Sequence, residues 1–284
     1  MATAKASNVL AIVFDFDDTL APDSTSGFLD SIGLDVPAFW KAHKELLKAG
    51  WDPMPAYLHM MVEESNSRPK RQRITRESLK RWGRRAPLYA GVRGLFARMR
   101  RQVQSSDSTI KLECFLISSG IREVLSSTKI ANQFTNMWAC DFAYNREGAI
   151  ACPKNVVSFT DKTRFLFQIS KGLIGKSAKG DPFAVNRKVE NLRIPMDQMV
   201  VVGDGFTDIP CFSLIQKAGG VAIGVYDRES RDRWGKAWGF IEDKRVAHVV
   251  AADYRKHSGL DDALSMAIET MTRKIKLRRI TYQG

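Results

Sequence analysis

The sequence predicts an α/β fold: a three-layer, Rossmann-like core built on a parallel sheet, with an inserted helical domain. Apolar runs at residues 9–14, 110–118 and 199–202 are typical of strands buried on both faces. Helical patterns alternate with these runs, as in a sheet whose two faces are both covered by helices. The stretch at residues 23–89 carries helical patterns alone, and we therefore expect it to be an insertion into the core.

The domain boundaries follow from where the strand–helix alternation stops and where it resumes. We expect residues 1–22 and 90–284 to form the core and residues 23–89 to form the helical domain. Glycine, proline and short polar runs divide the insertion into successive helices. Its predicted helices span residues 36–48, 55–65 and 76–84.

Beyond residue 90 the predicted elements alternate along the chain. Helices are predicted at residues 92–104, 162–170 and 209–218, and strands at residues 110–118, 138–144, 199–202 and 221–225. Thr160 or Asp161 is the expected N-cap of the second of these helices. Lys274–Arg279 are expected to lie in a basic helical tail.

Length and composition favour a protein with its own hydrophobic core and without a membrane span. The chain has 284 residues, of which 44% are hydrophobic, enough for a core domain and a smaller second domain. Its apolar stretches are all shorter than the roughly 18 residues of a membrane-spanning helix. We therefore expect a soluble, cytoplasmic protein whose four cysteines are reduced.

The formal net charge of +13 predicts a basic surface, which attracts phosphorylated ligands and polyanions alike. The basic residues gather in three groups, at Arg68–Arg85, Arg93–Arg101 and Arg273–Arg279. We interpret these groups mainly as solvated helix faces, with Arg98, Arg100 and Arg101 on the solvent side of their helix. Contact with nucleic acid or with a membrane surface is the less favoured alternative.

A group of acidic and hydroxyl side chains follows the first predicted strand. Asp15, Asp17 and Thr19 come directly after the apolar run at residues 9–14. Ligands in open α/β sheets bind just past the carboxyl ends of the strands, so a site is expected at these side chains. Crowded carboxylates repel one another unless a proton or a cation neutralises them, and a hard divalent ion is the usual solution. The predicted ion is Mg²⁺.

Two other predicted strands end in polar residues suited to the same site. Ser118 closes the strand at residues 110–118, and Asp204 and Asp208 follow the strand at residues 199–202. Because a parallel sheet brings the three strand ends to one edge, we expect a single site. Ser118 and Asp208 each precede a helix as well, so a helix-capping role is an alternative for both.

A site in which carboxylates and a metal handle a phosphoryl group also needs a fixed cation for the phosphoryl oxygens. Lys162, at the start of a predicted helix, is the preferred candidate. Lys154, in the predicted loop after Cys152-Pro153, is the second candidate.

The run Asp15-Phe16-Asp17-Asp18-Thr19 resembles the Asp-x-Asp-x-Thr signature of the haloacid dehalogenase-like (HAD) hydrolase superfamily. Ser118 resembles that superfamily's second motif, Lys162 its third, and Gly203–Asp208 its Gly-Asp-x-x-x-Asp fourth. The resemblance covers the predicted core and is greatest to the phosphoserine-phosphatase-like branch. The segment between the first two motifs is similar in position and length to that branch's helical C1 cap.

The resemblance implies a role for each of these residues. Asp15 would be the nucleophile that forms an aspartyl-phosphate, and Asp17 would be the general acid and base. Thr19, Ser118 and Lys162 would bind the substrate phosphate. The implied Mg²⁺ ligands are Asp15, Asp17, Asp204 and Asp208, with Asp17 acting through its backbone carbonyl.

The implied activity is Mg²⁺-dependent hydrolysis of a small phosphorylated metabolite beneath a closing cap. The acid at Asp17 argues against dehalogenation, because a halide leaves without protonation. A phosphotransferase or mutase that uses the same aspartyl-phosphate is the first alternative. The basic charge leaves a second one, a nucleic-acid-associated phosphatase or basic binding protein.

Overall fold

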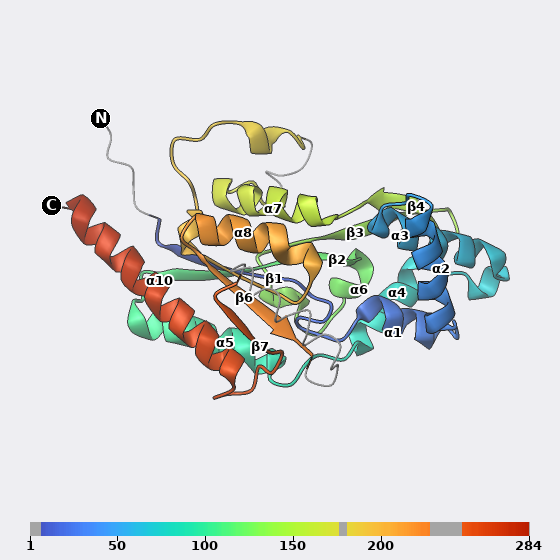
Figure 1. Cartoon of the computed structure of the whole chain (residues 1–284), viewed down its shortest axis with the longest axis horizontal. Coiled ribbons are helices and arrows are strands. Elements are labelled where there is room, and N and C mark those ends of the chain that lie inside the picture. Colours follow the sequence, from blue (N-terminus) through green and yellow to red (C-terminus); the bar gives the residue numbers. More distant parts are fainter. Residues whose placement is uncertain (1–6, 176–180, 228–245, 284) are drawn as a thin grey trace.

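The structure is a computed structural model that describes residues 7–175, 181–227 and 246–283, and it confirms the predicted α/β class (Figure 1). The remaining residues of the predicted core lie outside this description. Within the described ranges, one seven-stranded sheet has the order β4-β3-β2-β1-β5-β6-β7. The strands are β1 (Val9–Phe14), β2 (Lys111–Ile121), β3 (Asn136–Tyr144), β4 (Ile150–Asn155), β5 (Met199–Gly203), β6 (Val221–Tyr226) and β7 (His248–Ala251).

β1 lies at the centre of the sheet and is paired on both sides. It runs parallel to β2 and to β5, with Phe14 opposite Leu116 on one side and Val202 on the other. The pairs β2–β3, β5–β6 and β6–β7 are also parallel, whereas β4 is antiparallel to β3. The carboxyl ends of β1, β2 and β5 therefore meet at one edge of the sheet, as predicted.

Helices cover both faces of the sheet and give the three layers (Figure 1). Along β1, Leu10, Ile12 and Phe14 belong to the hydrophobic core of one face, whereas Ala11 and Val13 belong to that of the other. Each of these five residues is at most 2% exposed, which requires a strand that is apolar throughout. The covering helices are α5 (Val92–Ser106) and α10 (Gly259–Gln283) on the first face, and α7 (Phe159–Lys171) and α8 (Ile209–Lys217) on the second.

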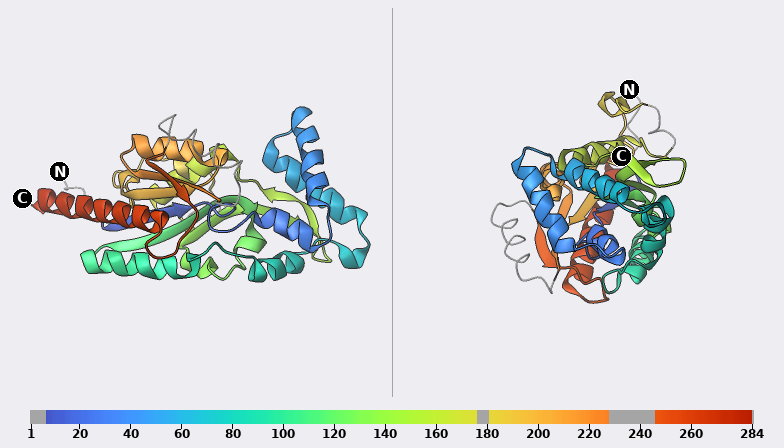
Figure 2. Two further views of the ribbon diagram at one scale, coloured as in Figure 1. Left: turned by 60° about the horizontal axis from the view of Figure 1, so that its bottom comes forward. Right: turned by 90° about the vertical axis from the view of Figure 1, so that its right-hand side faces the viewer.

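The predicted insertion forms four α-helices at one end of the molecule (Figure 2). Each helix begins at an N-cap side chain that accepts hydrogen bonds from first-turn amides, and these N-caps are Asp23, Asp35, Asp52 and Thr75. The three predicted helices are confirmed, and one more, α1, precedes them. The helices are α1 (Ser24–Ser31), α2 (Val36–Lys48), α3 (Pro53–Ser67) and α4 (Arg76–Arg85). Residues 23–89 as a separate domain stay a prediction.

The start of α7 corrects the capping prediction. Ser158, rather than Thr160 or Asp161, is the N-cap: its hydroxyl accepts from the Asp161 amide, and the Asp161 carboxylate accepts from the Ser158 amide. This reciprocal capping box starts the helix at Phe159, upstream of the predicted start. Lys162 consequently lies one turn inside a well-anchored helix.

Two strands were not predicted from the sequence. β4 contains Pro153, which is tolerated because β4 is an edge strand of the sheet. Lys154 therefore lies in a strand and not, as expected, in a loop. β7 is only four residues long and its side chains are exposed or half-buried, so its hydrophobic pattern is weak.

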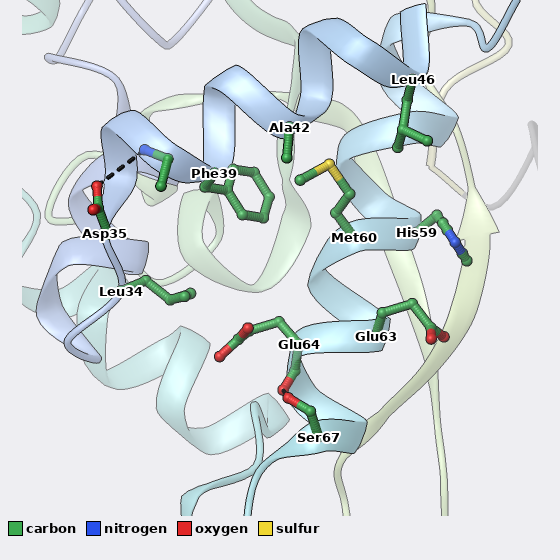
Figure 3. A pocket seen from close by; sticks show the side chains of 11 residues that line it. Leu34, Asp35, Phe39, Ala42, Leu46, His59, Met60, Glu63, Glu64 and Ser67 are labelled. Carbon is green, nitrogen blue, oxygen red and sulfur yellow. Dashed lines mark hydrogen bonds between the residues drawn. The ribbon is translucent and has the colours of Figure 1, made fainter. Parts of the chain in front are cut away.

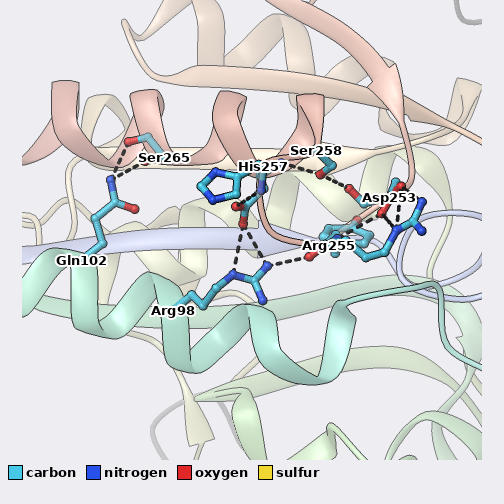
Figure 4. Close-up of polar contacts among 9 residues, drawn as sticks. Arg98, Gln102, Asp253, Arg255, His257, Ser258 and Ser265 are labelled. Carbon is cyan, nitrogen blue, oxygen red and sulfur yellow. Dashed lines mark hydrogen bonds and ion pairs between the residues drawn. The ribbon is translucent and has the colours of Figure 1, made fainter.

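α10 lies alongside α5, and polar contacts join the two helices (Figure 4). The Arg98 guanidinium donates to Asp261 Oδ1 at 2.8 Å and to the Tyr254 carbonyl at 2.5 Å. Arg98 is therefore half-buried between elements, and its predicted place on a solvated face is wrong. Arg100 is exposed, as predicted.

The predicted basic tail is helical and belongs to α10. Two of its cations pair with acids of the core: Arg278 with Asp197 and Arg279 with Asp107. Part of the charge that gives the chain its basic character is thus neutralised inside the molecule. Although α10 has 25 residues, neither it nor any other helix among the described residues is apolar enough over its length to cross a membrane.

Candidate active site

Asp15 stands at the carboxyl end of β1, between two parallel neighbours. Its amide donates to the Val202 carbonyl at 2.9 Å, which continues the β1–β5 ladder by one residue and fixes the backbone. Asp15 Oδ1 accepts from the Phe16 amide at 2.7 Å. Only 7% of the residue is exposed. A carboxylate held in this way has one oxygen committed to the backbone and one directed to other side chains.

Lys162 provides the positive charge at the centre of the site. Its ammonium donates to Asp15 Oδ2 at 2.7 Å, to Asp208 Oδ1 at 2.8 Å and to Thr207 Oγ1 at 3.1 Å. The residue is 1% exposed. Burial lowers the pKa of Lys162, but Asp15 and Asp208 outweigh burial and raise that pKa above its usual value, so the ammonium stays charged. Lys154 is exposed, and the structure brings Lys162 into the cluster instead.

Three carboxylates at the carboxyl edge of the sheet lie close enough together to bind one metal ion. One oxygen each of Asp15, Asp204 and Asp208 lie within 4.8 Å of one another. Burial and the repulsion of the neighbouring acids raise the pKa of Asp204 well above its usual value. Burial also raises the pKa of Asp208 to about 6, against the attraction of Lys162. A buried set of oxygen donors with excess negative charge fits Mg²⁺. Asp17 contributes no side-chain oxygen to this set.

Asp17 lies on the side of the site that faces the helical insertion. Its Oδ1 accepts from the Ser24 amide at 2.8 Å, at the start of α1. A Cβ atom at Gly120 would come within 2.6 Å of Asp17 Oδ2, so only glycine permits this approach. Burial, and then repulsion by Asp23, raise the pKa of Asp17 well above its usual value. Asp17 is therefore a carboxylic acid that holds its proton more tightly than an exposed aspartate does.

Thr19 is fully buried and links the loop after β1 to two distant segments. Its hydroxyl donates to Asp204 Oδ1 at 3.4 Å, rather than to Asp17. Its carbonyl accepts from the Tyr254 hydroxyl at 2.9 Å. Tyr254 is also fully buried, so this hydrogen bond fixes the loop after β1 to the protein interior.

Ser118 lies within β2, which continues to Ile121. Its Oγ accepts from the Gly120 amide at 3.0 Å, and only 1% of the residue is exposed. The short helix α6 (Arg122–Leu125) has Ile121 as its N-cap, so the capping alternative for Ser118 is wrong. The hydroxyl remains beside the strand end, where it can still donate a hydrogen bond.

Lys162 and the Gly205 amide hold the Asp208 carboxylate, which does not cap α8. Asp208 occupies the N-cap position of α8, yet its side chain makes no capping hydrogen bond to that helix. The carboxylate instead accepts from Lys162 and from the Gly205 amide. A Cβ atom at Gly203 would come within 2.4 Å of Asp208 Oδ2. The glycine of this motif thus makes room for the carboxylate.

Sequence reasoning missed the residues that connect the site to the rest of the chain. The Tyr57 hydroxyl donates to the Ser119 carbonyl at 2.6 Å, and the Trp82 indole donates to the Ser24 carbonyl at 3.0 Å. Both aromatic residues come from the insertion. Tyr254 is 235 residues from Thr19 along the chain, and no local sequence pattern predicts such a pairing.

A cavity of about 680 Å³ lies between α2 and α3, separate from the acid cluster (Figure 3). Its walls include Phe39, Leu46 and Met60. Three acids, Asp35, Glu63 and Glu64, also line it, so a phosphorylated ligand would be repelled there. The binding of a substrate phosphate is thus better served by the edge of the sheet around Lys162.

Comparison with known proteins places the fold. No family model matches the chain. An uncharacterised protein of Borreliella burgdorferi is 26% identical, over 89% of this chain and 94% of that protein. The identity is too low to carry a function, and that relative has none assigned.

Solved structures are similar at lower identity. A phosphoserine phosphatase with bound substrate has a TM-score of 0.57 at 14% identity, covering 90% of this chain and 97% of that one. A phospho-aspartyl intermediate analogue of phosphoserine phosphatase has a TM-score of 0.55 at 15% identity, covering 92% and 99%. A HAD-family hydrolase of Salmonella enterica serovar Typhi has a TM-score of 0.57 at 12% identity, covering 86% and 67%.

Proposed function

We propose that this chain, which has the HAD-like fold of the phosphoserine phosphatases, is a phosphomonoester hydrolase that uses Asp15 as its nucleophile. One observation carries the proposal: the Lys162 ammonium contacts both Asp15 and Asp208 at the carboxyl edge of the sheet. A buried cation at that edge provides positive charge for the oxygens of a phosphoryl group in the transition state.

In the first step, an oxygen of the Asp15 carboxylate attacks phosphorus. The bond between phosphorus and the leaving oxygen breaks, and Asp17 gives its proton to that oxygen. The raised pKa of Asp17 supports this assignment, because the acid must hold a proton before the substrate binds. The product of the step is an aspartyl-phosphate on Asp15.

In the second step, water attacks the phosphorus of the aspartyl-phosphate. Asp17, now a carboxylate, takes a proton from the water, and the bond between Asp15 and phosphorus breaks. Inorganic phosphate leaves, Asp15 is a carboxylate again and Asp17 is protonated again. Both side chains thus return to their starting states.

The other residues of the site bind rather than react. Lys162, Ser118 and Thr19 would donate hydrogen bonds to the phosphoryl oxygens. Asp15, Asp204 and the Asp17 carbonyl would hold Mg²⁺, with Asp208 as a further ligand or as the residue that positions Lys162. When bound, the ion would stabilise the negative charge on the transferring group.

We infer that residues 23–89 act as a cap over this site. The hydrogen bonds from Tyr57 to Ser119 and from Trp82 to Ser24 support this inference, because they join the insertion to the loops at the sheet edge. Closure of such a cap would exclude water during the first step, and its opening would admit the water that attacks in the second step.

The substrate class that fits this proposal is a small phosphorylated metabolite. The similar solved structures include phosphoserine phosphatases, so phosphoserine is the first compound to test. No observation favours a mutase, and the pairing of Arg98, Arg278 and Arg279 with acids weakens the nucleic-acid alternative.

The proposal is tested by phosphate release from an aryl phosphate and from phosphoserine, with and without Mg²⁺, for the wild type and Asp15→Asn. We expect metal-dependent release that the substitution abolishes, with circular dichroism showing an unchanged fold. Release by the variant above about one part in a thousand would contradict the role of Asp15 as nucleophile, given the size of nucleophile effects in comparable enzymes.

A further inference from the structure

A second cavity lies in the helical insertion, and arginines dominate its walls. It encloses about 490 Å³, a volume within the range of small-molecule sites, roughly 300–1,000 Å³. No acidic residue is among the described residues that line it. We call it the arginine cavity and define it by Arg68, Arg71, Arg73, Arg81, Thr75 and Ser78.

The arginine cavity is separate from the candidate active site. Ile32, which follows α1, lines the cavity, whereas Ser24 at the other end of α1 donates to Asp17. The eight residues of α1, at about 1.5 Å rise per residue, place the two ends about 12 Å apart. A ligand in the cavity would therefore not occupy the position of the reacting phosphoryl group.

Two of the four arginines already have partners. Arg68 Nε donates to Glu64 Oε1 at 2.7 Å, and its Nη1 donates to the Ile32 carbonyl at 3.0 Å. Arg73 lies 3.7 Å from a Glu147 oxygen, and the same carboxylate also pairs with Lys70. Arg73 Nε is buried and has no hydrogen-bond partner. The Nε–H of Arg73 is thus a buried hydrogen-bond donor without an acceptor.

The other two arginines have no acidic partner among the described residues. Arg71 and Arg81 are exposed, and no acid pairs with either of them within the ranges that the structure describes. They come from different elements, the 3₁₀ turn Lys70–Gln72 and the helix α4, and both line the same cavity. Two guanidinium forks facing one space are suited to an anion with charge on two groups.

From these contacts we propose that the arginine cavity binds a small oligophosphate. Arg71 and Arg81 would each hold one phosphate group. A guanidinium binds two oxygens of a phosphate group at once. Two linked phosphates therefore offer one negatively charged group to each of the two arginines that have no acidic partner among the described residues. The proposal rests on the cavity alone and does not depend on the activity proposed for Asp15.

The test is calorimetric titration of the full-length protein with inorganic pyrophosphate in low-salt buffer without Mg²⁺. Arg71→Gln/Arg81→Gln removes the two uncompensated charges. Arg85→Gln/Arg93→Gln removes two exposed charges outside the cavity and so matches the change in net charge. We expect pyrophosphate to bind the wild type and the control pair equally, and the cavity pair at least tenfold more weakly. Turnover of an aryl phosphate should be the same in all three proteins.

Several results would overturn the proposal. These are absence of pyrophosphate binding to the wild type, equal loss in the control and cavity pairs, or a loss of turnover in the cavity pair that parallels its loss of binding. Citrate bound as tightly as pyrophosphate would overturn the assignment to oligophosphates. An oligonucleotide that binds far more tightly, with a steep salt dependence confined to wild type and control, would overturn the assignment to a small ligand.

Discussion

Replacing Lys162 with methionine tests the centre of the candidate active site. The ammonium lies 2.7 Å from Asp15 and 2.8 Å from Asp208, both buried. At an effective dielectric constant of about 20, each pair attracts by about 6 kcal/mol, and burial of the charges offsets most of this. The remaining effect on the transition state should resemble loss of one electrostatic donor, about 3–4 kcal/mol. We therefore expect kcat/KM to fall roughly 10²–10³-fold.

The assay is phosphate release from an aryl phosphate at saturating Mg²⁺, with urea denaturation of each variant to confirm that it folds. Lys154→Ala is the control, because Lys154 is exposed and belongs to β4. Its kcat/KM should stay within about twofold of the wild-type value, as for an ordinary surface substitution. Lys162→Arg keeps the charge but not the shape, so it should recover only part of the activity.

The reasoning would be refuted if Lys162→Met kept more than about a tenth of the wild-type kcat/KM while folded, since the loss would then be below about 1.4 kcal/mol. It would also be refuted if Lys154→Ala lost more activity than Lys162→Met. The second result would make Lys154 the lysine that binds phosphate.

Three further changes test other parts of the structure. Asp204→Asn removes one of the three clustered carboxylates, so the Mg²⁺ concentration for half-maximal turnover should rise at least about tenfold in a metal titration. Tyr254→Phe leaves the buried Thr19 carbonyl without its donor, and urea denaturation should show a loss of about 1–3 kcal/mol in the free energy of unfolding. Burial raises the pKa of Glu113, but the hydrogen bonds and charges of Arg193 and Lys111 together outweigh burial and hold that pKa below its usual value. The resulting stabilisation is full above the usual pKa of a glutamate and is lost as the pH falls through the lowered value. The unfolding free energies of wild type and Glu113→Gln should therefore converge as the pH is lowered.

Each of these expectations has a contradicting result. An unchanged metal requirement in Asp204→Asn would remove Asp204 from the predicted ligand set. Unchanged stability of Tyr254→Phe would mean that the Thr19 carbonyl finds another donor. A constant gap between wild type and Glu113→Gln across the acid range would show that ionisation of Glu113 does not contribute to stability.

The sequence predicted the central strands and most helices because their hydrophobic patterns are strong. β1 is buried on both faces, so every residue in it is apolar and the pattern is unmistakable. β4 and β7 were missed because they are short or partly exposed and carry little pattern. Arg98 was misplaced for a related reason: a helix pattern separates apolar from polar residues but does not show that Asp261, far along the chain, neutralises the arginine.

The sequence by itself predicted most residues of the candidate site, because Asp15 and Asp204 each follow a strand and Ser118 lies near the end of another. Parallel strands place their carboxyl ends at one edge. Only the tertiary structure decided between Lys162 and Lys154. The choice depends on which ammonium lies beside Asp15, and Lys162 is 147 residues from Asp15 along the chain. The hydrogen bond from Tyr254 to Thr19 and the convergence of Arg71 and Arg81 on one cavity were equally beyond the sequence. Such contacts depend on how separate helices and strands pack together. The hydrophobic pattern of one segment does not show which residue of another segment its side chains will contact.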